Sequence, residues 1–241
     1  MMSQGNVFIT GGSRGIGAEM VRRFTEAGYT VAFTYAKAQK EAEELSRQTG
    51  ALAIHADSAK RDDVVCAVSE FHEKIGLADI LINNAAVSSI GLFTDMSDDE
   101  WDALRAVNLD SVLQYTRLLI PDMVGKKRGR ILQISSMWGQ VGASCEVAYS
   151  TTKAALHGFT KALAKELGPS GITVNAIAPG VIATQMNASL SESVLAELCE
   201  ETPLGSLGTP LDVARAALFL AGEGGNFITG QVLGVNGGIV M

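Results

Sequence analysis

The sequence has few cysteines and histidines and no long apolar run, and each shortage argues against a class of protein. Its three cysteines, Cys66, Cys145 and Cys199, are an odd and widely spaced set, and its three histidines are scattered. We therefore expect neither a disulfide framework nor a metal site. The expected location is a reducing compartment, the cytoplasm. No apolar stretch reaches the roughly 18 residues of a membrane span, and the N-terminus shows no signal peptide. No membrane partner is expected.

Proline is also scarce, with 5 residues, whereas glycine is abundant, with 26, and apolar residues make up 47% of the chain. This composition predicts a large core with many tight turns and argues against disorder. The net charge of −7 argues against binding of nucleic acid or of an anionic membrane. Because neither a linker nor an internal repeat interrupts the sequence, we expect one domain spanning residues 1–241.

Segments with the apolar pattern of strands alternate with segments of helical periodicity. The expected strands are Val7–Thr10, Thr30–Tyr35, Ala51–Ala56, Asp79–Asn83, Arg130–Ser135, Ile172–Ile177 and Gln231–Val235. The expected helices are Ile16–Ala27, Lys37–Gln48, Arg61–Ile75, a long helix over Asp98–Ile120, Ala148–Leu167, Ser189–Glu201 and Pro210–Ala221. Repeated strand–helix units with almost continuously apolar strands predict an α/β fold, a doubly wound parallel β-sheet (Rossmann fold) with helices on both faces.

Four polar or turn-forming residues fall at or just beyond the carboxyl ends of expected strands: Thr10, Asn83, Ser136 and Pro179. Sheets of this kind bind their ligands in the crevice outside these ends. The four segments are therefore expected to meet over one binding crevice.

The segment Tyr-Ser-Thr-Thr-Lys places Tyr149 and Lys153 four residues apart, and Ser136 lies thirteen residues before the tyrosine. On a helix, positions i and i+4 share a face, so the phenol and the ammonium can reach one pocket. A nearby cation lowers the pKa of a tyrosine from about 10, and a serine hydroxyl could hold a carbonyl oxygen while the tyrosine protonates it. The alternative interpretation of this pair is an exposed helix face with a half-buried tyrosine. Ser135 is the other candidate for the serine that holds the carbonyl oxygen.

The first expected strand and helix are joined by the glycine-rich turn Thr-Gly-Gly-Ser-Arg-Gly-Ile-Gly. Glycine allows tight turns and close approach of the backbone to a phosphate, and the helix N-terminus offers free N–H groups to it. The turn therefore predicts dinucleotide binding, although a turn without a ligand would look similar. The residues that we expect to contact the cofactor here are Gly11, Ser13, Arg14, Gly15, Ile16 and Gly17.

The end of the second strand tests which dinucleotide binds. NAD sites carry an acidic residue there for the ribose hydroxyl, but this chain has Tyr35 followed by alanine and Lys37. Arg14 and Lys37 could neutralise a 2′-phosphate, which favours NADP(H), although Lys37 could equally be a solvated helix-start residue. Asp57, just after the third strand, could bind the adenine amino group or cap a helix.

Taken together, the motifs resemble the short-chain dehydrogenase/reductase family over essentially the whole chain. They are the glycine-rich turn, Asn-Asn-Ala-Ala at residues 83–86, Asn108, Ser136, the Tyr149 and Lys153 pair, and Pro179-Gly180. The family pattern usually has glycine where Ala86 stands.

The resemblance implies a role for each matching residue. Tyr149 would be the general acid in carbonyl reduction, Lys153 would lower its pKa and bind the nicotinamide ribose, and Ser136 would orient the substrate oxygen. Asn108 would hold a water molecule in a proton relay to Lys153. The further cofactor contacts that the family implies are Asn84, Ala85, Pro179, Gly180, Ile182 and Thr184, beside Tyr149 and Lys153 themselves.

Within the family, the chain is most similar to bacterial 3-oxoacyl-(acyl-carrier-protein) reductases of fatty-acid synthesis. An acidic carrier protein needs a basic docking surface. The only dense basic cluster in the sequence consists of Lys126, Lys127, Arg128 and Arg130. The alternative is that these residues form a solvated loop with no docking role. Pro169-Ser170 stands where such reductases often have an arginine. The alternatives are reduction of an aminopentanone-type ketone on the modified lysine of elongation factor P, reduction of another small ketone, or non-enzymatic NADP sensing.

Residues 185–205 are expected to form a lid over the substrate. Candidate pocket walls are Met137, Trp138, Gln140, Val141 and Met186. By resemblance, the helices Asp98–Ile120 and Thr151–Leu167 would pair across a dimer interface, and the apolar C-terminus would complete a homotetramer.

Overall fold

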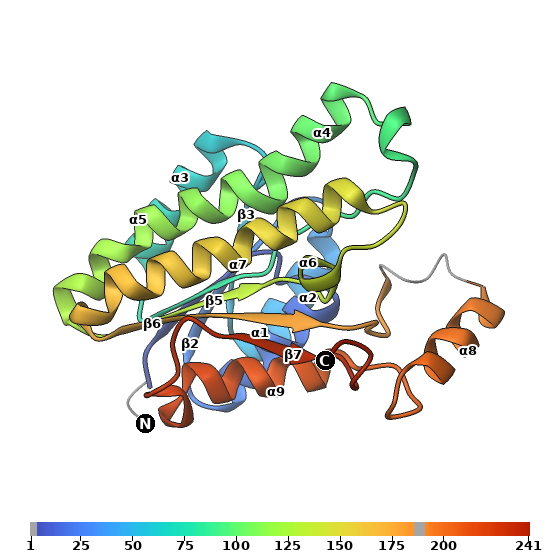
Figure 1. The fold of residues 1–241 in the computed structure, drawn as a ribbon. Helices are drawn as coiled ribbons and strands as arrows, with labels where there is room; N and C mark the ends of the chain where they lie inside the picture. The colour runs from blue at the N-terminus through green and yellow to red at the C-terminus, as the bar shows by residue number, and fades with distance from the viewer. Residues whose placement is uncertain (1–3, 186–190) are drawn as a thin grey trace.

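The computed structural model describes residues 4–185 and 191–241, and it shows one seven-stranded sheet covered by helices (Figure 1). All neighbouring strands are parallel, in the order β3-β2-β1-β4-β5-β6-β7. The strands are β1 Asn6–Ile9, β2 Thr30–Tyr35, β3 Leu52–His55, β4 Ile80–Asn83, β5 Gly129–Ile134, β6 Ile172–Pro179 and β7 Val232–Val235. The expected doubly wound parallel sheet is confirmed.

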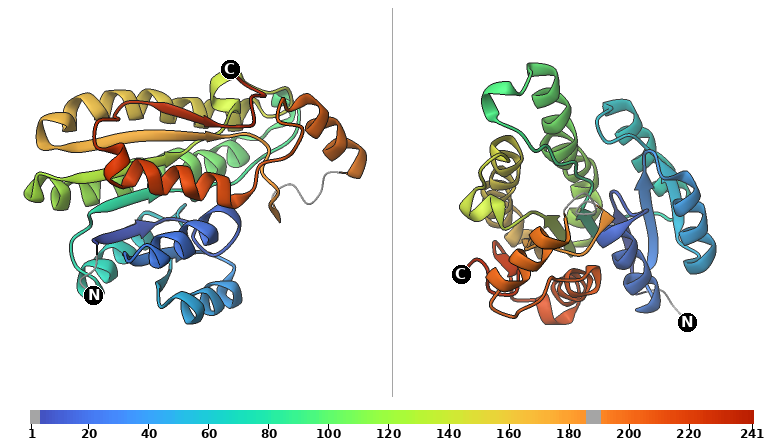
Figure 2. Two further views of the ribbon diagram at one scale, coloured as in Figure 1. Left: turned by 90° about the horizontal axis from the view of Figure 1, so that it is seen from below. Right: turned by 90° about the vertical axis from the view of Figure 1, so that its right-hand side faces the viewer.

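The strands are apolar on both faces because both faces are covered. In β1, Val7 and Ile9 contact one buried cluster and Phe8 contacts the other, as the two-residue period of a strand requires. The first cluster lies under α1, α2 and α9, and the second under α3, α5 and α7. Figure 2 shows the resulting three layers, with the sheet in the middle.

Most helices follow the expected ranges with small shifts at their ends. The helices are α1 Gly15–Glu26, α2 Gln39–Thr49, α3 Arg61–Lys74, α4 Asp98–Arg105, α5 Ser111–Lys126, α6 Trp138–Val141, α7 Val147–Leu167, α8 Glu192–Glu201 and α9 Pro210–Ala221. Of these, α6 was not expected, and α5 runs six residues beyond the expected Ile120. Lys37 lies outside the helix that was expected to begin there, since α2 starts at Gln39. Residues 189 and 190, expected to begin the helix of α8, lie outside the described residues.

One expected helix is interrupted. The segment predicted as a single helix from Asp98 contains a π-helical turn, Ala106–Asp110, between α4 and α5. The start of α4 agrees with the capping box: the Ser97 hydroxyl accepts the Glu100 N–H, and the Glu100 carboxylate accepts the Ser97 N–H at 2.8 Å. The sequence marks the beginning of the helix correctly and gives no sign of the interruption.

Among the described residues, no helix combines the length and the apolar character needed to cross a bilayer.

Candidate active site

The four residues expected at the strand ends do lie along one edge of the sheet. Thr10 follows β1, Asn83 ends β4, Ser136 lies two residues beyond β5, and Pro179 ends β6. Because β1, β4, β5 and β6 are consecutive neighbours in the sheet, these residues lie in a row at its carboxyl edge (Figure 1), where sheets of this kind bind their ligands.

Tyr149 and Lys153 lie on the buried side of α7, with 9% and 2% of their surfaces exposed. The Lys153 ammonium donates a hydrogen bond to the Ile134 carbonyl at 2.9 Å and lies 5.6 Å from the centre of the Tyr149 ring. The helical spacing therefore brings both groups to the end of β5. This geometry differs from the exposed helix face that was the alternative interpretation of the pair.

The two neighbouring serines have different partners. Ser136 accepts the Trp138 N–H at 3.1 Å and forms a hydrogen bond with the Tyr149 side chain. Ser135 instead donates to the Lys153 carbonyl at 3.0 Å and lies 2.8 Å from His157 Nε2. Ser136 is thus the serine that faces the phenol, whereas Ser135 fixes the end of β5 to α7.

Burial governs the ionisation of both groups. Burial and the charge of Glu146 raise the pKa of Tyr149 to about 12, against the effect of its hydrogen bond with Ser136. Burial lowers the pKa of Lys153 to about 8. The protein groups alone therefore do not give the lowered tyrosine pKa that the sequence suggested, because desolvation of the phenol outweighs any attraction from the ammonium.

Asn108 lies in the π-helical turn, is fully buried and is held by two backbone groups. Its side-chain oxygen accepts the Val87 N–H at 2.9 Å, and its amide donates to the Val87 carbonyl at 2.8 Å and to the Thr152 hydroxyl at 3.3 Å. Asn108 therefore joins the chain after β4 to the residue next to Lys153. Thr152 is the link.

The glycine-rich turn needs glycine for steric reasons. Gly11 and Gly15 have φ values of 66° and 53°, which side chains rarely adopt. A Cβ on Gly17 would lie 2.2 Å from the Gly11 carbonyl oxygen. The turn ends at the N-terminus of α1, where Ile16 packs against the core. The first turn of a helix has free N–H groups, which are what an anion site requires.

Asn84 and Ala85 contact the glycine-rich turn directly. The Asn84 amide donates to the carbonyls of Thr10 and Gly11 at 3.0 and 2.9 Å. The Thr10 hydroxyl accepts the N–H groups of Asn84 and Ala85. The motif after β4 therefore holds the turn in place.

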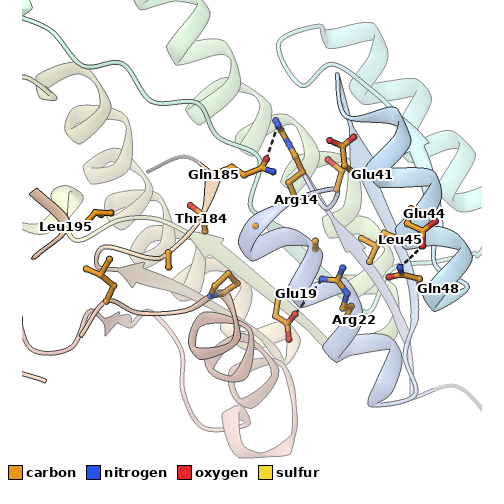
Figure 3. Close-up of a pocket in the computed structure, with 16 residues that line it drawn as sticks. Arg14, Glu19, Arg22, Glu41, Glu44, Leu45, Gln48, Thr184, Gln185 and Leu195 are labelled. Carbon is orange, nitrogen blue, oxygen red and sulfur yellow. Dashed lines mark hydrogen bonds and ion pairs between the residues drawn. The ribbon is translucent and has the colours of Figure 1, made fainter. Parts of the chain in front are cut away.

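A cavity of about 800 Å³ opens beside the turn, between α1, α2 and residues 183–185 (Figure 3). Ser13, Arg14 and Thr184 line it, and Arg14 donates to Gln185 at 3.4 Å. Glu41 and Glu44 of α2 also line it, although nothing in the sequence pattern pointed to them. Tyr149 does not border this cavity, so it adjoins the turn rather than the catalytic groups.

Three other expected cofactor contacts, Tyr35, Lys37 and Asp57, lie near the ends of β2 and β3. Tyr35 packs edge-on against His55, with ring centres 5.4 Å apart, and Lys37 is exposed. The Asp57 carboxylate accepts the Ala59 N–H at 3.1 Å, within the turn that precedes α3. It does not cap that helix, whose N-cap residue is Lys60.

The turn after β6 connects the site to the last strand. The Pro179 carbonyl accepts the Met137 N–H at 2.9 Å, and the Gly180 N–H donates to Val235 at 3.0 Å. A Cβ on Gly180 would lie 2.8 Å from the Asn236 backbone, so only glycine fits. Ile182 is buried and pairs with Gly208 in a short bridge. Met186 and residues 187–190 of the expected lid lie outside the described residues, and α8 forms the middle of that segment.

The basic cluster lies at the opposite end of the sheet. Lys126 binds Asp79 at 2.8 Å, Arg130 contacts Asn226, and β5 runs its six residues from this cluster toward Ser136. Six strand residues span about 20 Å. A carrier bound at this cluster would therefore not be adjacent to Tyr149 of the same subunit.

Two residues near the site were not singled out from the sequence. Glu146, at the start of α7, is half-buried and accepts a hydrogen bond from the Trp138 side chain. His157, near Lys153, is buried against Ser135. An acidic residue three positions before the tyrosine was the available signal for Glu146. Within residues 4–185 and 191–241, no three acidic, histidine or cysteine side chains form a possible metal site.

Comparison with known proteins agrees with this arrangement. Residues 11–240 match the family model described as enoyl-(acyl carrier protein) reductase. The chain is 39% identical to a 3-oxoacyl-(acyl-carrier-protein) reductase of Chlamydia trachomatis, covering 96% of this chain and 95% of the relative. It is 40% identical to the Aquifex aeolicus protein of that name, covering 98% of each.

A solved structure of a Serratia marcescens short-chain dehydrogenase/reductase mutant is also similar, with a TM-score of 0.92, 35% identity and 98% of each chain covered. The chain therefore belongs to the short-chain dehydrogenase/reductase family of oxidoreductases, which act on CH–OH and C=O groups.

Proposed function

We propose that the protein reduces the ketone of a 3-oxoacyl group carried on acyl-carrier protein, with NADPH as the reductant. The observation that carries this proposal is the convergence of Ser136, Tyr149 and Lys153 at the end of β5. Resemblance to reductases of that name over nearly the full length supports the choice of ketone.

In this proposal, the hydroxyls of Ser136 and Tyr149 hold the carbonyl oxygen. Tyr149 gives its proton to that oxygen as a C–H bond forms at the carbon, so the ketone becomes a secondary alcohol. The nicotinamide cofactor of the family supplies the hydride when bound. Lys153 as a cation stabilises the phenolate that remains. Its pKa of about 8 leaves most of it protonated at neutral pH.

The choice of NADP(H) rests on charge beside the glycine-rich turn. Arg14 lines the cavity there, and β2 ends without a carboxylate that would repel a 2′-phosphate. Glu41 of α2 lines the same cavity and works against an anion, so Arg14 is the residue on which the preference depends.

NADPH oxidation tests the proposal directly. We expect turnover with a 3-oxoacyl thioester on acyl-carrier protein, slower turnover with the free thioester, and none with an enoyl thioester. Tyr149→Phe should keep NADPH binding and lose turnover by roughly 100-fold or more. Reduction of the enoyl thioester, or an unchanged rate in Tyr149→Phe, would contradict the proposal. Binding of NADPH without turnover of any ketone would instead favour the sensing function.

A second candidate is reduction of the ketone on the modified lysine of elongation factor P. The position of the basic cluster favours this second substrate. A docking surface for an acidic carrier protein should border Tyr149, whereas the basic cluster lies at the other end of β5. The test is to measure kcat/KM for elongation factor P bearing the ketone and for 3-oxoacyl carrier protein at equal concentration. The substrate with the higher kcat/KM is the favoured one.

We further infer a homotetramer. Leu113 and Val124 are exposed on α5, and Phe219, Phe227 and Leu233 are exposed around the edge strand β7. Exposed apolar surface beside helices and an edge strand is typical of subunit interfaces.

A further inference from the structure

One carboxylate beside the reacting tyrosine has no part in the chemistry described above. Glu146 precedes Tyr149 by three residues, at the N-cap position of α7, and it is half-buried. It lies close enough to Tyr149 for its charge to raise the pKa of the phenol. A carboxylate so close to the point where a ketone oxygen must bind is in a position to contact the substrate.

Glu146 has no cationic partner among the residues that the structure describes. None of the ion pairs found there includes it. Its side chain accepts one hydrogen bond, from the Trp138 indole N–H. A partly desolvated carboxylate without a counter-charge is unfavourable, so its presence needs a reason.

Helix capping does not provide that reason. Although Glu146 occupies the N-cap position of α7, its side chain makes no capping hydrogen bond to the helix. The carboxylate instead turns toward Trp138 of α6, the short helix that follows Ser136. Glu146 therefore lies between the segment that carries Ser136 and the helix that carries Tyr149.

The backbone before Glu146 is strained. Cys145 has a φ of 62°, in the left-handed region, and its carbonyl accepts the Gly91 N–H at 2.8 Å. A non-glycine residue there costs on the order of 1–2 kcal/mol. Strain of this kind persists mainly at functional sites, where the orientation of a neighbouring group matters.

We propose that Glu146 recognises the substrate, selecting ketones that carry a positively charged amine near the carbonyl and rejecting those that carry an anion there. An amine would supply the missing counter-charge, and an anion would meet both repulsion and desolvation. A neutral thioester lies between the two. The inference rests on the proposed reduction of ketones at Tyr149, and it favours an amine-bearing ketone among the candidate substrates.

Three ketones of equal reach test this. The first is a methyl ketone with a trimethylammonium group three methylenes from the carbonyl. The second is its neutral tert-butyl isostere, and the third is the corresponding carboxylate. In the wild type, kcat/KM should fall in that order, with roughly tenfold between cation and isostere for one close charge pair.

Glu146→Gln keeps the shape and the acceptor for Trp138 while removing the charge. We expect this variant to lose the preference for the cation, to gain activity on the carboxylate and to change little on the isostere. Asp99→Asn is the matched control, since it removes an exposed negative charge from the first turn of α4. It should leave the order unchanged.

The outcomes separate the two levels of inference. If the wild type reduces none of the three ketones or a 3-oxoacyl thioester with NADPH, the proposed function fails. If it reduces all three ketones at similar rates, or if Glu146→Gln keeps the wild-type order, Glu146 does not select the substrate and the further inference alone is overturned. If Glu146→Gln loses turnover of all three ketones but still binds NADPH, Glu146 has a structural role, and this result also overturns the further inference.

Discussion

Among single residues, Lys153 has the least favourable surroundings. Its ammonium is almost fully buried, and its hydrogen bond goes to the neutral Ile134 carbonyl. Burial lowers the pKa from 10.5 to about 8, so the unfolded chain binds a proton more tightly than the folded one. At neutral pH, burying the cation therefore costs on the order of 3 kcal/mol of folding free energy.

Replacement of this lysine should separate stability from activity. We expect Lys153→Met to unfold in urea with a free energy about 2 kcal/mol higher than the wild type at pH 7, and to lose ketone reduction. Since the pKa is lowered in the folded state, wild-type stability should rise between about pH 8 and 10.5. The variant should not show this rise, and an equal rise in both would refute the assignment.

Arg14 is expected to decide the cofactor preference. Arg14→Ala should raise the KM for NADPH by roughly tenfold and leave the KM for NADH nearly unchanged, because only NADPH carries the 2′-phosphate. Arg22→Ala is the control, since Arg22 lines the same cavity but pairs with Glu19 at 3.6 Å. Equal losses with both cofactors would show that Arg14 does not bind the phosphate.

The catalytic residue types could be predicted from the sequence because a helix repeats every 3.6 residues and strand ends share an edge. Tyr149, Lys153 and Ser136 come together for those reasons. Glu146 could not be predicted in this way, since its importance depends on burial and on the absence of a counter-charge among the described residues. The sequence alone also could not show whether Ser135 or Ser136 faces the tyrosine, because that depends on the hydrogen-bond partners that the fold gives each serine.

At the scale of elements, the π-helical turn between α4 and α5 determines where Asn108 points. An uninterrupted helix would place the residues around position 108 on a different face, since the π-helical turn adds a residue. The interruption lets the Asn108 amide satisfy both backbone groups of Val87. It could not be predicted from the sequence, because those partners come from the loop after β4.

Asn108→Ala should therefore affect both stability and activity. It leaves the N–H and the carbonyl of Val87 without their partner, which costs about 1–3 kcal/mol for each group that stays unsatisfied. We expect a lower urea midpoint and a lower kcat, because the Thr152 contact beside Lys153 is also lost. Asn84→Ala is unsuitable as a control because Asn84 binds the glycine-rich turn. Asp102→Ala is the control, since Asp102 is exposed on α4 and its replacement should change neither the urea midpoint nor kcat.

Across the whole molecule, the parallel sheet and the layers of helices on both faces follow from the alternation of strands and helices, and these were predicted correctly. The proposed tetramer depends instead on side chains at the surface. Phe227 is fully exposed, Phe219 is about half exposed, and both lie near the open edge at β7. A single chain leaves these groups in water, which disfavours the isolated subunit.

Phe227→Glu should convert the tetramer into dimers, since a carboxylate cannot be buried at an apolar contact without a partner. Sedimentation velocity measures this directly. Leu77→Glu is the control, because Leu77 is an exposed apolar residue outside the proposed interfaces and should leave the assembly intact. A wild-type protein that sediments as a monomer would contradict the inferred tetramer.

The hydrogen bonds between the glycine-rich turn and the end of β4 have a kinetic consequence. The Thr10 hydroxyl and the Asn84 amide together make four bonds that fix the turn as the protein folds. A dinucleotide that binds there loses its own freedom of motion but does not have to order the loop. Association should therefore be limited by diffusion and charge rather than by rearrangement. The backbone amides of Asn84 and Ala85, which donate to the Thr10 hydroxyl, should already exchange hydrogen slowly before the cofactor binds.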